Sequence, residues 1–287
     1  MTPFELAEPR SLRKAVALLD PDDPSVRPIA GGTALMLMMK SGLFQPRRLV
    51  SLRNVEKRFS TIGRTADGRV RIGALTPLAV LEHAPAIRRH LPVVAQTLRT
   101  LSNVRVRNVA TLGGHLAHAD PHLDLPPVLI ALGAELVVIG PTGERTLSLA
   151  SLHTGYYETV LARDELIAQV LVPPQAPKRA AYLKCTTRSA DDWPALGIAV
   201  ALTLEGGAVR EAAIVLGAAT VTPVRLSAAE SVMHGAAIDD ALLRRAGDAA
   251  ADGVELISDP QGSAAYKRQL VRVSVRRALV QALGLRL

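Results

Sequence analysis

The sequence contains a single cysteine, Cys185, among its 287 residues. One thiol cannot close an internal disulfide, and an iron–sulfur cluster held only by thiolates needs several cysteines. We therefore exclude a disulfide-stapled scaffold and an all-cysteine iron–sulfur centre within this chain.

Aromatic residues are also scarce, at 3% of the chain, although the formal net charge is +8. Proteins that bind single-stranded nucleic acid stack its bases on aromatic side chains placed among basic ones. The arginine pairs at 47–48, 88–89 and 276–277 are not interleaved with aromatic residues. We therefore expect a solvated basic surface and no nucleic-acid partner, while a basic face toward an acidic partner subunit stays open.

The sequence also lacks a long uninterrupted apolar run. Its longest, from Leu125 to Ile139, contains two prolines and Glu135 and is too short to span a bilayer. The first nine residues are acidic rather than apolar, unlike a secretory signal peptide. We expect a cytoplasmic protein with no membrane span.

What is present indicates a globular protein, with 48% hydrophobic and 21% charged residues. Strand-like and helix-like segments are mixed without steady alternation, which favours an α+β fold. The proline pair at 173–174 indicates a domain boundary. We expect three regions: 1–55, 56–177, and 178–287, the last with a small antiparallel sheet and helices.

Local patterns predict where helices and turns begin. Serine or threonine before an apolar run favours an N-cap, and serine followed by glutamate three residues later matches the capping box. Gly206-Gly207, between two apolar runs, predicts a hairpin. Residues 102–124 form a polar, glycine-containing stretch. The predicted caps are Ser11, Thr76 before Pro77, Ser227 with Glu230, and Ser263.

Two glycine pairs are candidates for binding phosphate. Glycine has no Cβ and accepts positive φ, so successive amides can converge on phosphate oxygens. Two such turns suit a pyrophosphate, although either one alone is more often an ordinary tight turn. Neither the Rossmann nor the P-loop motif is present. The pairs lie in Ala30-Gly31-Gly32-Thr33-Ala34-Leu35, after a predicted strand, and in Ala110-Thr111-Leu112-Gly113-Gly114-His115.

Longer segments extend these motifs in a fixed order: "RPIAGGTALMLMMKSG", "VRIGALTPLAVLE", "RNVATLGGHLAHADPHLDLPPVLIALGAEL" and "DPQGSAAYKRQLVRVSVRRAL". Together they resemble the FAD-binding medium subunit of molybdenum hydroxylases, a family that includes aerobic carbon monoxide dehydrogenase and xanthine dehydrogenase. The resemblance covers nearly the whole chain. Four ordered matches are far more specific than a single glycine pair.

The resemblance implies an oxidoreductase subunit with a two-subdomain FAD-binding fold, formed by residues 1–55 and 56–177, and a C-terminal flavoprotein domain. Such a subunit takes electrons from a [2Fe–2S] small subunit and passes them to an external acceptor. A large subunit with the molybdenum cofactor completes a heterotrimer, and two heterotrimers form the expected dimer. NAD, quinone and oxygen all stay open as the acceptor.

The resemblance also implies individual FAD contacts. Asp124 aligns with an aspartate used on the ribityl hydroxyls, although it also suits a helix N-cap. Lys184 aligns with a lysine near the pyrimidine end of the flavin, and is equally typical of a solvated strand. Trp193 aligns with an aromatic residue that covers the isoalloxazine ring, the alternative being an ordinary packing residue. The full implied set is Ala30, Gly31, Gly32, Thr33, Ala34, Leu35, Thr111, Gly113, Gly114, His115, Asp120, Asp124, Lys184 and Trp193.

Two positions depart from the family pattern. His115 stands where asparagine is usual, and Ala34 stands where serine, aspartate or glutamate is common. The alanine removes a possible hydrogen bond near the cofactor. The sequence alone therefore leaves the strength of FAD binding open.

Two other functions fit parts of the sequence. Histidine and aspartate are dense between residues 115 and 124, which suits a metal-dependent hydrolase because imidazole and carboxylate bind zinc, iron or manganese. That pattern lacks the H-E-x-x-H spacing and leaves the glycines unexplained. The third interpretation is an assembly subunit without flavin. The candidate metal ligands are His115, His118, Asp120, His122 and Asp124.

Overall fold

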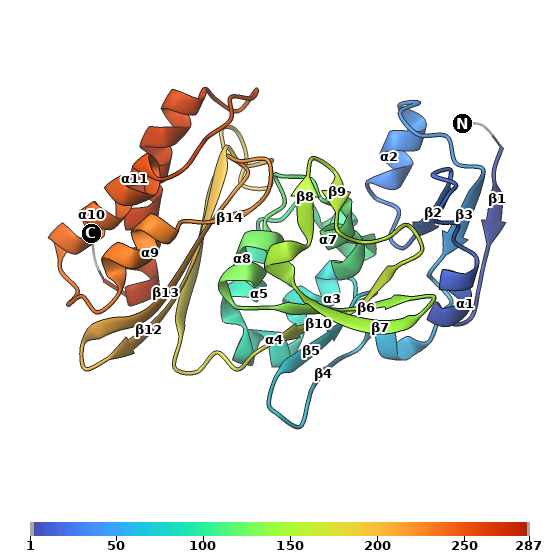
Figure 1. The fold of residues 1–287 in the computed structure, drawn as a ribbon, viewed down its shortest axis with the longest axis horizontal. Helices are drawn as coiled ribbons and strands as arrows, with labels where there is room; N and C mark the ends of the chain where they lie inside the picture. The colour runs from blue at the N-terminus through green and yellow to red at the C-terminus, as the bar shows by residue number, and fades with distance from the viewer. Residues whose placement is uncertain (1–2, 286–287) are drawn as a thin grey trace.

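Three sheets follow one another along the chain of the computed structural model, which describes residues 3–285 (Figure 1). The first is a three-stranded parallel sheet in the order β1-β3-β2. Parallel strands need crossover connections, and short helices supply them here. These elements are β1 (Glu5–Ala7), α1 (Leu12–Ala17), β2 (Val26–Ile29), α2 (Leu35–Lys40) and β3 (Arg48–Ser51).

The second sheet is antiparallel, in the order β4-β5-β10-β6-β7. Six short α-helices and a separate two-stranded sheet, β8-β9, accompany it. The strands of the second sheet are β4 (Ile62–Arg64), β5 (Val70–Gly73), β6 (Glu135–Gly140), β7 (Gly143–Ser148) and β10 (Leu166–Val172). The other elements are η1 (Lys57–Ser60), α3 (Leu78–His83), α4 (Pro85–His90), α5 (Pro92–Leu98), α6 (Val104–Val109), α7 (Leu112–His118), α8 (Leu125–Ala131), η2 (Leu149–Ser151), β8 (His153–Gly155) and β9 (Glu158–Thr159).

The third sheet is antiparallel in the order β11-β12-β13-β14 and carries the C-terminal helices. In Figure 1 these elements, coloured gold to red, lie at the opposite end of the molecule from β1. They are β11 (Arg179–Cys185), β12 (Leu196–Glu205), β13 (Ala208–Gly217), β14 (Val224–Arg225), α9 (Ser227–Met233), α10 (Asp240–Asp252) and α11 (Ala264–Leu283).

Strand β12 is apolar on both faces because each face is covered. Ile198, Val200 and Leu202 belong to the core beneath α9, α10 and α11. The alternate residues Ala199 and Ala201 belong instead to the central core, on the side where α8 packs against β12 and β13. Successive side chains of a strand point to opposite faces, so this one strand joins two cores. The C-terminal domain is therefore packed directly against the middle of the molecule.

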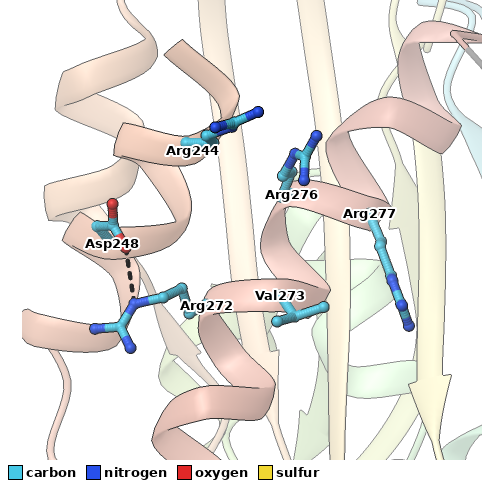
Figure 2. A pocket seen from close by; sticks show the side chains of 6 residues that line it. All are labelled: Arg244, Asp248, Arg272, Val273, Arg276 and Arg277. Carbon is cyan, nitrogen blue, oxygen red and sulfur yellow. Dashed lines mark hydrogen bonds and ion pairs between the residues drawn. The ribbon is translucent and has the colours of Figure 1, made fainter. Parts of the chain in front are cut away.

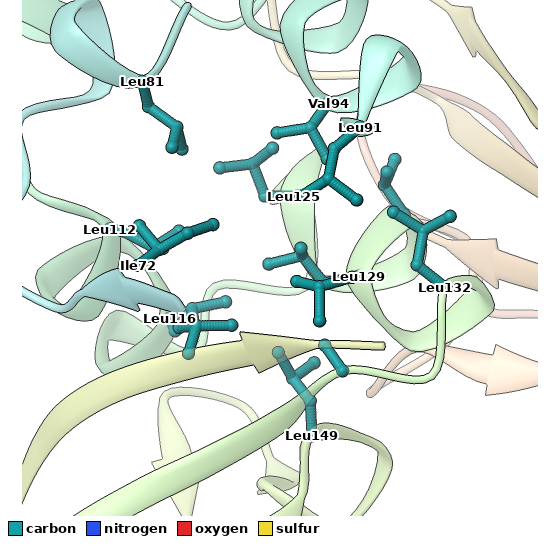
Figure 3. Packing of buried hydrophobic residues seen from close by; sticks show 14 of the residues in the cluster. Ile72, Leu81, Leu91, Val94, Leu112, Leu116, Leu125, Leu129, Leu132 and Leu149 are labelled. Carbon is teal, nitrogen blue, oxygen red and sulfur yellow. The ribbon is translucent and has the colours of Figure 1, made fainter. Parts of the chain in front are cut away.

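The central core is aliphatic, as the scarcity of aromatic residues requires. Figure 3 shows how its leucine side chains converge from several helices toward the second sheet. Fully burying one such side chain contributes roughly 1.5–3 kcal/mol. Residues labelled there include Leu81, Leu91, Leu112, Leu116, Leu125, Leu129 and Leu149.

The N-terminal sheet shares its core with the second sheet. Leu12, Val16 and Val50 pack in one cluster with Ile139 of β6 and with Leu166 and Ala168 of β10. This contact fixes the end of β2, and hence the glycine segment after it, against the middle of the molecule.

Several sequence predictions are confirmed. The α+β class is correct, since one parallel sheet and larger antiparallel sheets are mixed with helices without regular alternation. The Oγ atoms of Ser11 and Ser263 accept amide hydrogen bonds at the starts of α1 and α11. The hairpin around Gly206-Gly207 joins β12 and β13. None of the helices within the described residues is long and apolar enough to cross a membrane.

Three local predictions are wrong. Ser227 is not a cap, because it is the first residue of α9 and no side chain caps that helix. Glu230 instead accepts a hydrogen bond from the amide of Ile214 at 2.8 Å and pairs with Arg225. Thr76 does not cap α3, whose N-cap is Pro77, and its hydroxyl is buried. The predicted turn at Gly113-Gly114 is not a turn, since both glycines lie in α7. In the first two cases tertiary packing overrides the local motif.

Candidate functional site

The two glycine segments lie against each other, although they are far apart in the sequence. A Cβ atom on Gly31 would stand 2.2 Å from the carbonyl oxygen of Val109 and 2.8 Å from the Cα atom of Ala110. A side chain at Gly31 would therefore force the two backbones apart. The next contact is looser, because a Cβ atom on Gly114 would stand 3.8 Å from the Cβ of Ala30.

The first glycine segment offers free amides. Gly32 has φ +71°, a left-handed conformation that suits glycine, and it turns the chain from β2 into α2. Within residues 3–285, no hydrogen bond uses the amides of Gly31, Gly32, Thr33 or Ala34. Backbone donors need an acceptor from water or a ligand when the protein gives none. Consecutive free amides of this kind form an anion-binding nest.

The second glycine pair has a different role from the one expected. It lies in the first turn of α7 and is not a free turn. The amide of Gly113 donates to the carbonyl of Ala74 at 2.6 Å, and the amide of Gly114 donates to Oγ1 of Thr111 at 3.2 Å. A Cβ on Gly113 would stand 2.7 Å from the Cβ of Ala74. This pair therefore permits close packing and does not supply unpaired amides.

Three histidines gather where the β8–β9 pair meets α7. Nε2 of His153 lies 2.9 Å from the carbonyl oxygen of Leu116 and donates to it. Nε2 of His115 and Nδ1 of His153 are buried, with no partner among the described residues. Burial lowers the pKa of His115 to about 3, and burial also lowers the pKa of His118 and His153. All three rings are therefore neutral near pH 7.

The residues considered as metal ligands do not converge. Asp120 accepts hydrogen bonds from His122 and from the hydroxyl of Tyr157, whereas Asp124 bonds to residues of β11. Within the part of the chain that the structure describes, no three His, Cys, Asp or Glu side chains form a set that could hold a metal ion. The metal-dependent hydrolase interpretation is therefore not supported.

Asp124 and Lys184 form a buried ion pair between the middle of the molecule and the C-terminal domain. Nζ of Lys184 donates to Oδ2 of Asp124 at 3.0 Å and to the carbonyl of Thr100 at 2.9 Å. The hydroxyl of Tyr182 donates to Oδ1 of Asp124 at 2.7 Å. Burial raises the pKa of Asp124, and the Lys184 cation and these hydrogen bonds oppose that rise. The Asp124 side chain does not cap α8.

Trp193 stacks on a histidine. The indole and the His122 imidazole are nearly parallel, at 7°, with ring centroids 5.2 Å apart. Trp193 remains 57% exposed, so it is not an ordinary core residue. Its predicted role as a cover for the flavin ring stays a prediction.

Several partners of these residues were not predicted from the sequence. Tyr182 could not be assigned to Asp124, because their contact is long-range. Lys267, which pairs with Asp259, is fully buried. It lies four residues before Val271, on the apolar face of the last predicted helix. A lysine on the apolar face of a helix needs a buried partner of opposite charge, so its position could have predicted a buried ion pair.

The arginine-rich groove between α10 and α11 is a weaker candidate site. Its charges are largely paired within the domain, with Arg272 bonded to Asp248 and Asp252 and Arg276 to Asp240. The groove also lies at the far end of the molecule from the glycine segments. Figure 2 shows its lining residues: Arg244, Asp248, Arg272, Val273, Arg276 and Arg277.

Two family models match the chain. Residues 2–175 match the FAD binding domain in molybdopterin dehydrogenase, and residues 181–282 match the CO dehydrogenase flavoprotein C-terminal domain. The chain is 34% identical over 278 residues to the nicotine 6-hydroxylase medium subunit of Paenarthrobacter nicotinovorans, covering 96% of each. It is 32% identical over 276 residues to the carbon monoxide dehydrogenase medium chain of Hydrogenophaga pseudoflava, again covering 96% of each.

Solved structures give the same result. Carbon monoxide dehydrogenase from Hydrogenophaga pseudoflava, in a form that lacks the Mo-pyranopterin moiety, contains a similar chain with a TM-score of 0.94 and 34% identity. The match covers 99% of both chains. A chain of quinoline 2-oxidoreductase from Pseudomonas putida 86 matches with a TM-score of 0.91 and 29% identity, covering 99% of this chain and 98% of that one.

Replacing Lys184 tests the buried pair. We expect Lys184→Met to lower the free energy of unfolding by about 3 kcal/mol, because Asp124 is left buried without its cation. The double variant Lys184→Met/Asp124→Asn should recover part of this loss. Urea denaturation gives the values, with Lys14→Met on the exposed surface of α1 as the control. A Lys184→Met protein as stable as the wild type would contradict the pairing.

Acid should destabilise the protein through the histidine cluster. The folded-state pKa of His115 is about 3, below the usual 6.5. The contribution of neutral His115 to the free energy of unfolding is therefore fully present above about pH 6.5. It is lost as the pH falls from there toward 3. Between pH 7 and pH 5, the wild type should lose about 2 kcal/mol more unfolding free energy than His115→Asn. The exposed His234→Asn is the control, and equal pH slopes for wild type and His115→Asn would refute the assignment.

Proposed function

The chain belongs to the family of FAD-binding subunits of molybdenum hydroxylases, and on that premise we propose that it transfers electrons within a larger enzyme. The resemblance seen in the sequence is confirmed by both family models and by the similar chains. The chain is an oxidoreductase subunit, and its cofactor is FAD.

The observation that carries the proposed site is the free-amide loop after β2. FAD contains a pyrophosphate, and the unpaired amides from Gly31 to Ala34 provide donors for such an anion. A Cβ atom on Gly31 would collide with a neighbouring backbone, and a Cβ atom on Gly113 would collide with Ala74, so both positions require glycine. The residues present therefore fit the cofactor. We propose that the first segment binds the pyrophosphate and that α7 forms the wall beside it.

When bound, FAD supplies two-electron redox chemistry, and the protein supplies binding, orientation and exclusion of water. We propose that the electrons come from a [2Fe–2S] small subunit, which itself receives them from a large subunit with the molybdenum cofactor. A chain with one cysteine fits this division, because the iron–sulfur relay then belongs to another subunit. The external acceptor and the dimer of heterotrimers stay predictions, as does the cytoplasmic location.

For the flavin ring, we propose that Trp193 is the covering residue. Its 57% exposure supports this, since the indole face away from His122 is available to a flat ligand. Lys184 and Asp124 are bonded to each other, which supports a role in holding the C-terminal domain in place. Their predicted contacts to the pyrimidine ring and the ribityl chain stay predictions, together with those of Leu35, His115 and Asp120.

We also propose the division into residues 1–55, 56–177 and 178–287. Each of the three sheets lies within one of these ranges, which supports the division. On this proposal, the first two regions hold the pyrophosphate where they meet, and the third carries Trp193.

Gly31→Ala should remove FAD from the protein. The new methyl group collides with Val109 and Ala110 and moves the free amides away from α7. We expect FAD affinity to fall by at least tenfold, equal to about 1.4 kcal/mol. The measurement is visible flavin absorbance per chain, after equilibration with FAD.

Gly63→Ala is the matched control, because a Cβ there meets only the flexible end of Arg71 at 3.3 Å. It should keep the flavin content of the wild type. A Gly31→Ala protein that is folded and fully loaded with FAD would rule out the proposed cradle. A wild type without flavin in every preparation would rule out the function itself.

A further inference from the structure

His122 lies in the loop between α7 and α8, and both edges of its ring face carboxylates. Nδ1 lies 3.1 Å from Oδ1 of Asp120, and Nε2 lies 3.4 Å from Oδ2 of Asp259. The two aspartates approach from different parts of the fold, since Asp259 precedes α11 in the C-terminal domain. Contacts on opposite edges fix the plane of the imidazole.

The two carboxylates are themselves held in place. Asp120 accepts a hydrogen bond from the amide of His122 at 2.8 Å and one from the hydroxyl of Tyr157 at 3.0 Å. Asp259 is bonded to the fully buried Lys267 and accepts a hydrogen bond from the amide of Gln261 at 2.9 Å. The imidazole is therefore supported by groups that are ordered without it.

Trp193 has one face on this fixed ring. The two planes differ by 7°, the side chain of His122 is 12% exposed, and Trp193 is 57% exposed. Trp193 follows strand β11 in a segment of bends and turns, so the backbone alone does not fix the indole. Flat contact with His122 is the one ring contact of Trp193 recorded within residues 3–285.

We propose that His122 is a positioning residue, which holds the Trp193 indole in the orientation that covers the flavin ring. This role rests on the proposed function, in which the indole face away from His122 covers the flavin ring. His122 does not itself touch the cofactor in this proposal. It acts through Trp193, with Asp120 and Asp259 as its supports.

Trp193 is the only tryptophan, so the intrinsic tryptophan signal reports on this one side chain and its surroundings. In the full-length chain, His122→Ala should change the intensity and shift the wavelength of tryptophan emission, and should remove the near-ultraviolet circular dichroism of the indole. His122→Phe restores a flat ring and should retain that dichroism. His234→Ala, at an exposed position after α9, is the control and should match the wild type.

The second measurement addresses the flavin. In the complex isolated through a tag on this chain, His122→Ala should weaken FAD binding by up to about tenfold, the equivalent of about 1.4 kcal/mol. The visible flavin spectrum should also change, as it does when a stacked ring is lost. His122→Phe should return both the affinity and the spectrum toward those of the wild type, whereas a purely structural role for the hydrogen bonds of His122 to Asp120 and Asp259 predicts no such return, because phenylalanine cannot form them.

Two results would overturn the positioning role while leaving the proposed function intact. One is a His122→Ala protein whose tryptophan signal, FAD affinity and flavin spectrum all equal those of the wild type. The other is a His122→Phe protein whose indole dichroism, FAD affinity and flavin spectrum are changed as much as those of His122→Ala. If the wild-type complex binds FAD and the Trp193→Ala complex has the same flavin spectrum, both the covering role of Trp193 and the positioning role of His122 are removed. A wild-type complex without FAD would overturn both proposals together.

Discussion

The close contact between the backbone at Gly31 and the backbone at Val109 and Ala110 is the constraint on which the site depends. It brings the end of β2 to the start of α7, and it holds there only because Gly31 has no side chain. Gly113, in the first turn of α7, approaches Ala74 closely for the same reason. The two glycines thus allow close backbone packing at the start of α7 and just before it, and the free amides after β2 take their position from that arrangement.

Buried charge plays a comparable part at the other junction. The Asp124–Lys184 pair joins α8 to β11, and the Asp259–Lys267 pair supports His122 at the edge of the same region. Buried ion pairs gain little net stability, because desolvation offsets their attraction, but a mispaired charge is costly. The Asp124–Lys184 pair and the contact between His122 and Asp259 cross the junction, so they favour one docking arrangement of the C-terminal domain over alternatives, and that arrangement sets where Trp193 lies.

The parts of the fold encoded by short-range pattern were predictable from the sequence. Ser11, Ser263 and the hairpin at Gly206-Gly207 follow from local chemistry and are correct. Glu230 was assigned to a cap, whereas its partner Ile214 lies in strand β13, a long-range contact that no local motif reveals. For the site, the order of the motifs along the sequence predicted both glycine segments. The hydrogen bonds of the Gly113 and Gly114 amides were not predictable, because no motif shows that these glycines lie inside a helix. The stacking partner of Trp193 had been considered only as a metal ligand.

The shared core of the N-terminal sheet has a consequence for how the cofactor site forms. Residues such as Leu12, Val16 and Val50 complete their packing only against β6 and β10 of the next sheet. A three-stranded unit of this size cannot shield its apolar side chains unaided. The loop with the free amides therefore keeps its shape only where the central sheet is present to pack against this unit. The first fifth of the polypeptide is thus a dependent lobe, and it could not be transplanted to another scaffold as an autonomous nucleotide-binding module.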